Sequence, residues 1–371
     1  MNLIVNLLHK EPVMMTAGVL ALLSVCLVAP SASYLSYIDY GTLALLFSLM
    51  TVVAGLEKIG FFGGMAENLL KQTKTVRGLM LVLVLLCFFG SMFFTNDVVL
   101  IMFVPFSIKV LAMVGREEKI ILTVVLQTVA ANMGSMLLPI GNPQNLYLYQ
   151  YFDLDFENFI GIIAPYAAVA FVLLLGCIFL CKPQTVEIRD VQSGQKLKTR
   201  FGLWLYGALF LLSILAVLRV LPAVWLIPAV LVPILLYDPG VLKKVDYSLL
   251  LTFVFFFIFV GNLKAVPQIS EWLQTLLTGR EMIATLAASQ VISNVPATVL
   301  FSGFTGDYAD LLIGASLGGL GTLVASLASL ISFKIFAGST TLSKSRYLLV
   351  FTVCNVGFLL VLGLVYGVFG S

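Results

Sequence analysis

Residues 78–113 read GLMLVLVLLCFFGSMFFTNDVVLIMFVPFSIKVLAM, an apolar run that the polar triplet Thr95-Asn96-Asp97 interrupts near its centre. A membrane-spanning helix needs about 20 apolar residues, so the run is too long for one crossing. Its two flanks are both basic, with Arg77 before it and Arg116 after it. Because basic residues gather on the cytoplasmic side of a membrane, we predict a re-entrant hairpin whose tip lies near mid-membrane.

The whole chain has the composition of a membrane protein. Of its 371 residues, 60% are hydrophobic and only 11% are charged, whereas soluble domains carry about 25% charged residues. We therefore predict an all-α polytopic membrane protein with about nine transmembrane helices, two re-entrant hairpins and two broken helices. The single histidine, His9, excludes a serine–histidine–aspartate triad or a histidine-based metal site within one chain. We expect no enzyme, and the net charge of +3 is too small to indicate a nucleic-acid partner.

The distribution of basic residues predicts the orientation of the chain. With both hairpins re-entrant, the amino terminus is cytoplasmic and the carboxyl terminus lies outside. Of the 21 Lys and Arg residues, only Arg219, Lys264 and Arg280 then lie outside. We expect the protein in a bacterial-type plasma (inner) membrane, surrounded by lipid. An alternative for the first apolar run, residues 13–30, is a cleaved signal peptide.

Two halves of the chain repeat the same motifs in the same order. Three pairs of segments match: Asp39-Tyr40 with Asp246-Tyr247, Thr95-Asn96 with Ser293-Asn294, and 131–135 with 315–319. Ser293-Asn294 would then form the tip of a second re-entrant hairpin. In the predicted topology the halves have opposite orientations, and inverted repeats with broken helices are characteristic of secondary transporters.

The repeat predicts an alternation of scaffold and transport units. Charged residues at the ends of the spans, Glu57, Lys264, Glu281 and Asp310, are expected to face lipid headgroups. We divide the chain into scaffold helices 1–56, a first transport unit 57–181 with hairpin 78–113 and broken helix 119–148, a cytoplasmic linker 182–200, scaffold helices 201–263, and a second transport unit 264–371 with hairpin 281–304 and broken helix 310–333.

Each hairpin is followed by a span whose centre cannot remain helical. The first span contains Pro139 and Pro143 around Gly141, and the second contains the glycine-rich stretch 318–321. Backbone groups freed from a helix are costly in hydrocarbon, so such breaks occur where they line a buried, ion-binding cavity. Helix amino ends can hold an anion, while free carbonyls and Asn, Ser or Thr oxygens can bind Na+. We expect one substrate site and up to two cation sites there.

Asp97 is the only acidic residue that this topology places deep in the membrane. A carboxylate at that depth is by default a cation ligand or a proton carrier. The alternative is a helix cap that accepts backbone N–H bonds. For the polar residues near the tips and breaks, the alternative is interhelical hydrogen bonding or close packing of small side chains; these residues are Asn96, Asn142, Asn294, Ser135, Thr322 and Ser326.

These motifs together resemble the ion transporter superfamily, which includes divalent anion:sodium symporters, citrate transporters, arsenite permeases and certain sodium/proton antiporters. The resemblance rests on the two tips and on Gly141-Asn142-Pro143-Gln144-Asn145, and it covers nearly the whole chain. It implies a homodimer that works by an elevator movement of the transport units against the scaffold. It also implies no cofactor other than Na+ or H+ as the coupling ion.

The resemblance also suggests roles for individual residues. The expected substrate-binding residues are Thr95, Asn96, Asn142, Ser293, Asn294, Thr322 and Ser326. The expected cation-binding or proton-coupling residues are Asp97, Asn96, Asn132, Gly141, Asn145 and Asn294. Sodium is expected at Thr95, Asn96 and Gly141, and at Ser293, Asn294 and Ala325.

The third position of each tip distinguishes branches of the superfamily. Carboxylate transporters resemble Ser-Asn-Thr at both tips, whereas this chain has Asp97 at one tip and Val295 at the other, a pattern more like the arsenite-permease and sodium/proton branch. A carboxylate disfavours a multiply charged anion unless a cation neutralises it. Our leading prediction is a secondary active transporter of a small anion or carboxylate coupled to Na+ or H+. The alternatives are arsenite-type efflux or Na+/H+ antiport with Asp97 as carrier, and a channel-like or scaffolding protein without coupling.

Overall fold

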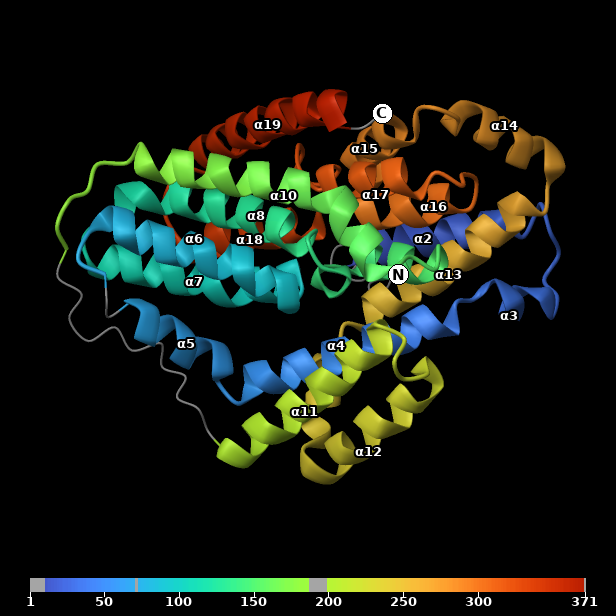
Figure 1. Ribbon diagram of the computed structural model, residues 1–371, viewed down its shortest axis with the longest axis horizontal. Helices are drawn as coiled ribbons and strands as arrows, with labels where there is room; N and C mark the ends of the chain where they lie inside the picture. Colours follow the sequence, from blue (N-terminus) through green and yellow to red (C-terminus); the bar gives the residue numbers. More distant parts are fainter. Residues whose placement is uncertain (1–10, 71–72, 187–198, 370–371) are drawn as a thin grey trace.

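The computed structural model describes residues 11–70, 73–186 and 199–369 and consists of helices joined by loops, with no strand among these residues (Figure 1). The prediction of an all-α polytopic membrane protein is confirmed. Seven of the described helices are long and apolar enough to cross a membrane. They are α4 (Tyr40–Lys58), α6 (Val76–Phe93), α7 (Asn96–Met113), α10 (Phe156–Phe179), α11 (Arg200–Val217), α13 (Tyr247–Lys264) and α19 (Lys344–Phe369).

Shorter helices complete the fold. In the first half they are α2 (Pro12–Ser24), α3 (Ser33–Tyr37), α5 (Phe61–Leu70), α8 (Ile120–Ser135) and α9 (Pro143–Tyr151). In the second half they are α12 (Leu226–Tyr237), α14 (Pro267–Leu277), α15 (Glu281–Ile292), α16 (Asn294–Ser302), α17 (Tyr308–Leu317) and α18 (Leu327–Ser339). Single turns of 3-10 helix lie at Glu117–Lys119, Pro139–Gly141 and Ala223–Trp225, with a longer one at Pro239–Lys244.

His9 lies outside these residues, as do residues 187–198 of the predicted linker 182–200. The first apolar run, 13–30, is helical only as far as Ser24. Its helix ends there in a tighter turn, since Val25 and Cys26 donate to carbonyls three residues back.

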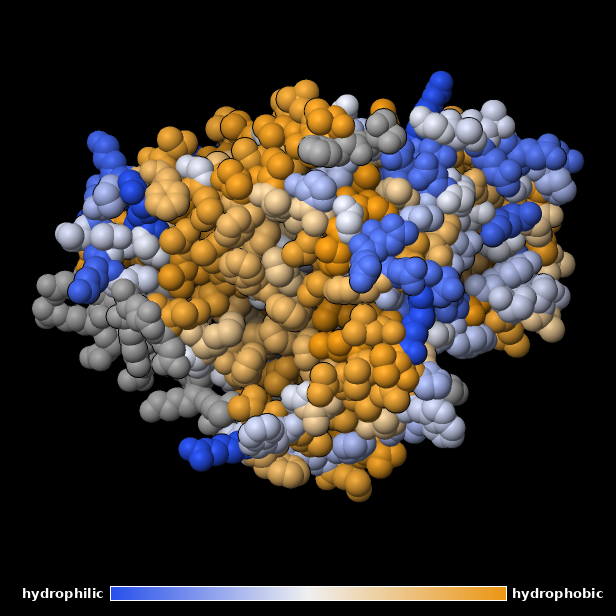
Figure 2. All heavy atoms as spheres, viewed as in Figure 1, coloured by the Kyte–Doolittle hydropathy of each residue, from blue (hydrophilic) through white to orange (hydrophobic). Residues whose placement is uncertain are grey.

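The surface of the molecule fits a membrane environment. Figure 2 shows hydrophobic residues covering the middle of this face, with hydrophilic residues gathered toward the two ends of its long axis. Long helices such as α6, α7, α10 and α19 run along that axis (Figure 1). Large apolar side chains are exposed along them, as at Phe89, Val172 and Leu360. Lipid tails can solvate such a surface, whereas water cannot.

The helices pack as two hairpins against two interrupted helices. The arms α6 and α7 both contact α8, and α15 and α16 both contact α17. The fit is close: a side chain at Gly134 on α8 would place its Cβ 2.0 Å from the Phe88 carbonyl oxygen on α6. Only glycine allows this approach.

Both halves show the same order of elements: a long helix, a short helix, a hairpin, an interrupted helix and a final long helix. The short helices α5 and α14 lie toward opposite ends of the molecule (Figure 1). Outside these units, α4 packs against α11 and α12, whereas α13 packs against α2. Thus α4, the first helix of the first half, is covered by α11 and α12, which precede the second half in the sequence. In the same way α13, the first helix of the second half, is covered by α2, which precedes the first half.

The hairpin geometry makes a labelling prediction. Because α6 begins at Val76 and α7 ends at Met113, cysteines introduced at Lys74 and Arg116 should react from the same side of the membrane. A membrane-impermeant maleimide added to right-side-out and inverted vesicles measures this. Labelling of the two positions from opposite sides would exclude a hairpin.

Candidate functional site

The first hairpin tip is the two-residue connection Phe94-Thr95 between α6 and α7. Thr95 occupies the N-cap position but makes no side-chain capping bond. Asn96 is 5% exposed, and its side-chain amide donates to Asn132 Oδ1 at 3.0 Å. Its own Oδ1 accepts a hydrogen bond from the backbone N–H of Asp97. The tip is therefore held by side chains rather than by an ordinary helix cap.

Asn132 joins the first tip to the second break. Its Oδ1 accepts hydrogen bonds from Asn96 and, at 3.0 Å, from Ser326 Oγ. Its amide donates to the Gly319 carbonyl and to Ser329 Oγ, both at 3.2 Å. Polar groups from both halves of the chain thus meet at one buried amide, as expected for a site placed between the tips and the breaks.

The first break runs from Met136 to Asn142, between α8 and α9. Asn142 caps α9 by accepting the N–H of Asn145 at 2.9 Å, and its amide donates to Ser135. Gly141 packs so closely that a Cβ there would lie 2.1 Å from the Ser135 carbonyl oxygen. Asn145 is fully buried, and its Oδ1 has no partner among the described residues. An unpaired buried amide oxygen is a fitting ligand for a cation.

The second tip is tied directly to the second break. The Asn294 N–H donates to the Ala325 carbonyl at 2.9 Å, and Ser293 Oγ lies 3.5 Å from the same oxygen. Ser293 has a φ of 74°, a conformation that non-glycine residues adopt only when their surroundings enforce it. The predicted set Ser293, Asn294 and Ala325 is therefore brought together.

Thr322, a predicted substrate ligand, is hydrogen-bonded to Gln290 of α15. Its backbone N–H donates to Gln290 Oε1 and its hydroxyl donates to the Gln290 carbonyl oxygen. Gln290 also donates to the Leu320 carbonyl. Sequence reasoning missed this glutamine, which joins α15 to the glycine-rich break.

A cavity of about 180 Å³ lies between α4 and the first tip. Thr95, Asp97 and Asn142 line it together with apolar residues of α4 such as Leu49 and Val53. Its volume suffices for several water molecules or a small solute. A second cavity, of about 300 Å³, lies between α2 and the second tip, where Ser293 and Ser326 line it.

Asp97 is not a helix cap in this structure. Its Oδ1 is buried and has no hydrogen-bond partner among the described residues, so it accepts no backbone N–H. The backbone hydrogen bonds that a helix-capping role would require are therefore absent at this oxygen among the described residues. A buried carboxylate oxygen without a partner is costly unless a proton or a cation satisfies it.

Three further charged residues line the same cavity: Glu57, Lys244 and Asp246. Lys244 Nζ lies 3.5 Å from Glu57 Oε2, and Asp246 caps α13. Glu57, at the end of α4, thus lines the cavity. The expectation that Glu281 faces headgroups is wrong, because this residue is only 5% exposed. The match of Asp246 with Asp39 marked a repeat in the sequence but gave no indication of this cavity.

Comparison with known proteins identifies the family. A model of the citrate transporter family matches residues 2–307. The chain belongs to the citrate transporter family. The resemblance to the ion transporter superfamily is thereby confirmed, and the protein is a membrane transporter.

Similar proteins carry compatible names. An uncharacterized transporter of Methanocaldococcus jannaschii is 31% identical over 332 residues, which is 88% of both chains. The inner membrane protein YbiR of Escherichia coli is 30% identical over 307 residues, 82% of both chains. The mouse P protein is 26% identical over 166 residues, 42% of this chain and 20% of that protein.

Proposed function

We propose that this protein is a secondary active transporter in which Asp97 binds the coupling cation, Na+ or H+, while a small anion or carboxylate is moved. The observation that carries the proposal is the unpaired, buried Asp97 Oδ1 at a hairpin tip beside a cavity. Binding of a cation or proton there would offset the cost of burying the carboxylate.

The charges around the cavity bear on the identity of the cargo. Glu57, Asp97 and Asp246 give three formal negative charges and Lys244 one positive charge, a balance of −2. Such a cavity attracts cations and repels a multiply charged anion. We therefore infer that an anionic cargo enters together with Na+ or protons.

The same charge balance favours a second candidate function, in which Asp97 exchanges Na+ for H+ or the cargo is a neutral metalloid acid. Neither cargo is repelled by the carboxylates that line the cavity. In both candidates Asp97 is the carrier of the coupling ion, so they differ only in what moves with it.

The movement that we propose is of the elevator type. The first tip, the breaks and the second tip are linked by side-chain hydrogen bonds, as at Asn96–Asn132 and Asn132–Ser326. In contrast, the cavity separates the first tip from α4 with no hydrogen bond across it among the described residues. A transport unit of this kind would move as one body along α4 and α13. We further propose a homodimer in the inner membrane, with a cytoplasmic amino terminus.

Purified protein in proteoliposomes tests the two candidates. Uptake of a panel of carboxylates and inorganic anions is measured under imposed Na+ or proton gradients, with a pH-sensitive dye and ²²Na+ recorded in parallel. Gradient-driven solute uptake supports the first candidate, whereas Na+/H+ exchange without solute supports the second. A solute flux that neither the Na+ gradient nor the proton gradient changes would contradict coupling to these ions.

The two tip asparagines should be essential. We expect Asn96→Ala and Asn294→Ala each to lower transport at least about tenfold, because each removes a ligand whose charge-assisted contact contributes about 1.5–3 kcal/mol. The matched control is Asn262→Ala, a buried asparagine outside the site that donates to Ser24 and Tyr34. Near-normal uptake by either tip variant would assign that asparagine to packing.

A further inference from the structure

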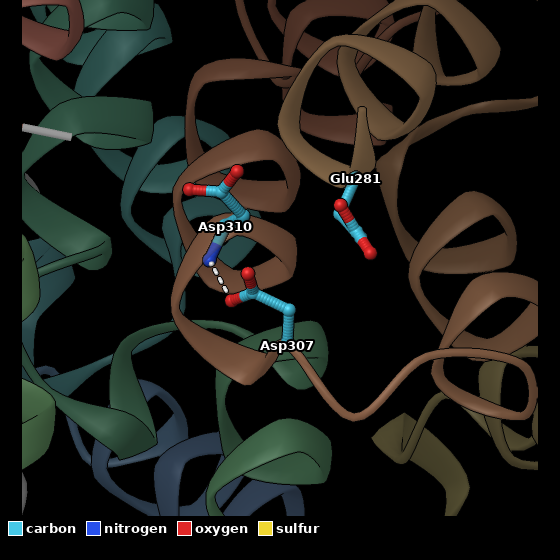
Figure 3. Close-up of side chains that lie close together, drawn as sticks. All are labelled: Glu281, Asp307 and Asp310. Atoms are coloured by element: carbon cyan, nitrogen blue, oxygen red, sulfur yellow. Dashed lines mark hydrogen bonds between the residues drawn. The ribbon is translucent and has the colours of Figure 1, made fainter. Parts of the chain in front are cut away.

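Three carboxylates converge outside the cavity described above. One oxygen from each of Glu281, Asp307 and Asp310 lies within 4.8 Å of the corresponding oxygens of the other two. Figure 3 shows Glu281, at the start of α15, facing Asp307 and Asp310 at the start of α17. None of them forms an ion pair with a basic side chain in the described part of the chain.

Helix capping explains only part of this arrangement. Asp307 Oδ1 accepts the N–H of Asp310 and so caps α17. Asp310 Oδ2 accepts a hydrogen bond from the Tyr366 hydroxyl at 2.6 Å, and Glu281 Oε1 accepts one from Thr305 at 3.1 Å. In each carboxylate, one oxygen thus accepts a hydrogen bond. Within the described residues, the other oxygen of each accepts none.

Glu281 provides the decisive observation. Its side chain is 5% exposed, and its buried Oε2 has no hydrogen-bond partner among residues 11–70, 73–186 and 199–369. A buried carboxylate beside two further carboxylates is doubly unfavourable, through desolvation and through like-charge repulsion. A bound cation would remove both costs.

We propose that Glu281, Asp307 and Asp310 bind a calcium ion. Calcium takes oxygen ligands at about 2.3–2.6 Å, so two of its ligands can be as much as about 5 Å apart. The three carboxylate oxygens, each within 4.8 Å of the other two, are close enough to share one such ion after small side-chain rotations. Magnesium is usually held by only one or two carboxylates and keeps several waters, so a site with three carboxylates favours calcium. The Thr305 hydroxyl lies beside Glu281, and Asp307 is exposed, so water can complete the coordination.

The ion would connect three elements of the second half. Glu281 belongs to the first arm of the second hairpin, Asp307 and Asp310 to the start of the interrupted helix, and Tyr366 to α19. A bound calcium ion would therefore link the start of α15 to the start of α17. The site shares no residue with the cavity at Asp97, so its test is independent of the transport proposal.

Calcium binding is measured on the purified full-length protein after treatment with EGTA. Isothermal titration with CaCl2 should give one ion per chain, and CaCl2 should raise the melting temperature by several degrees. MgCl2, and choline chloride at equal ionic strength, should have a smaller effect. Glu281→Gln should weaken calcium binding at least about tenfold, since ligand charge sets affinity.

Two further variants keep the test decisive. Asp307→Asn removes one charge but retains a residue that caps helices as well as Asp does, so this variant should fold while losing calcium affinity. Glu271→Gln, an exposed position on α14, is the matched control and should behave as wild type. The proposal is overturned if Asp307→Asn and Glu281→Gln respond to CaCl2 as wild type does, if Mg2+ stabilises equally, or if Ca2+ has no effect.

Discussion

Asp97→Asn should abolish the response of transport to imposed Na+ and proton gradients and flatten its dependence on pH. The amide has the size of the carboxylate but carries no charge and cannot take up a proton. Loss of one charge-assisted contact to the cation costs about 1.5–3 kcal/mol, which corresponds to a binding constant at least about tenfold weaker. Proteoliposome flux at several pH values, with each gradient imposed separately, measures the effect.

The control for this variant is Asp155→Asn, which makes the same chemical change at an exposed position with no side-chain capping bond. It should transport as wild type does. If Asp97→Asn keeps the wild-type response to both gradients, coupling does not depend on this carboxylate. The coupling site must then be built from neutral oxygens such as Asn145 Oδ1.

Asn132→Ala should have the largest effect on stability and should also stop transport. The substitution removes four hydrogen bonds, with Asn96, Gly319, Ser326 and Ser329. Side-chain hydrogen bonds in membrane proteins average about 0.6 kcal/mol each, so the loss should be about 2 kcal/mol. The melting temperature of the purified protein in detergent, together with solute uptake, reports both effects.

Asn355→Ala is the matched control for this prediction. Asn355 is equally buried, lies on α19, and donates one hydrogen bond, to the Phe351 carbonyl. It should destabilise the protein less and leave transport intact. A melting temperature for Asn132→Ala equal to that of the control would show that Asn132 does not hold the first tip against the second break.

The local features of the fold could be predicted from the sequence because they depend on short-range chemistry. Long apolar runs specify membrane helices, since backbone groups in hydrocarbon must be satisfied within the helix. Pro139 and Pro143 around Gly141 favour a break in the helix, and the structure has a 3-10 turn there followed by the capped start of α9, with Pro143 in its first turn. The polar triplet at 95–97 likewise marks the turn, since Thr95 lies in the connection between α6 and α7, and Asn96 and Asp97 begin α7.

The sequence named several residues of the sites, but only the tertiary structure showed which other side chains join them. Glu57 and Asp246 line one cavity with Asp97 although they are distant in sequence, and hydropathy placed Glu57 at a headgroup. Ser326 donates to Asn132 across 194 residues, and Thr305 to Glu281 across a hairpin. Such neighbours result from how helices pack, because each side chain's partners depend on the rotation and depth of another helix. The sequence by itself therefore determined where the chain breaks and turns, and only packing decided which charges and amides meet there.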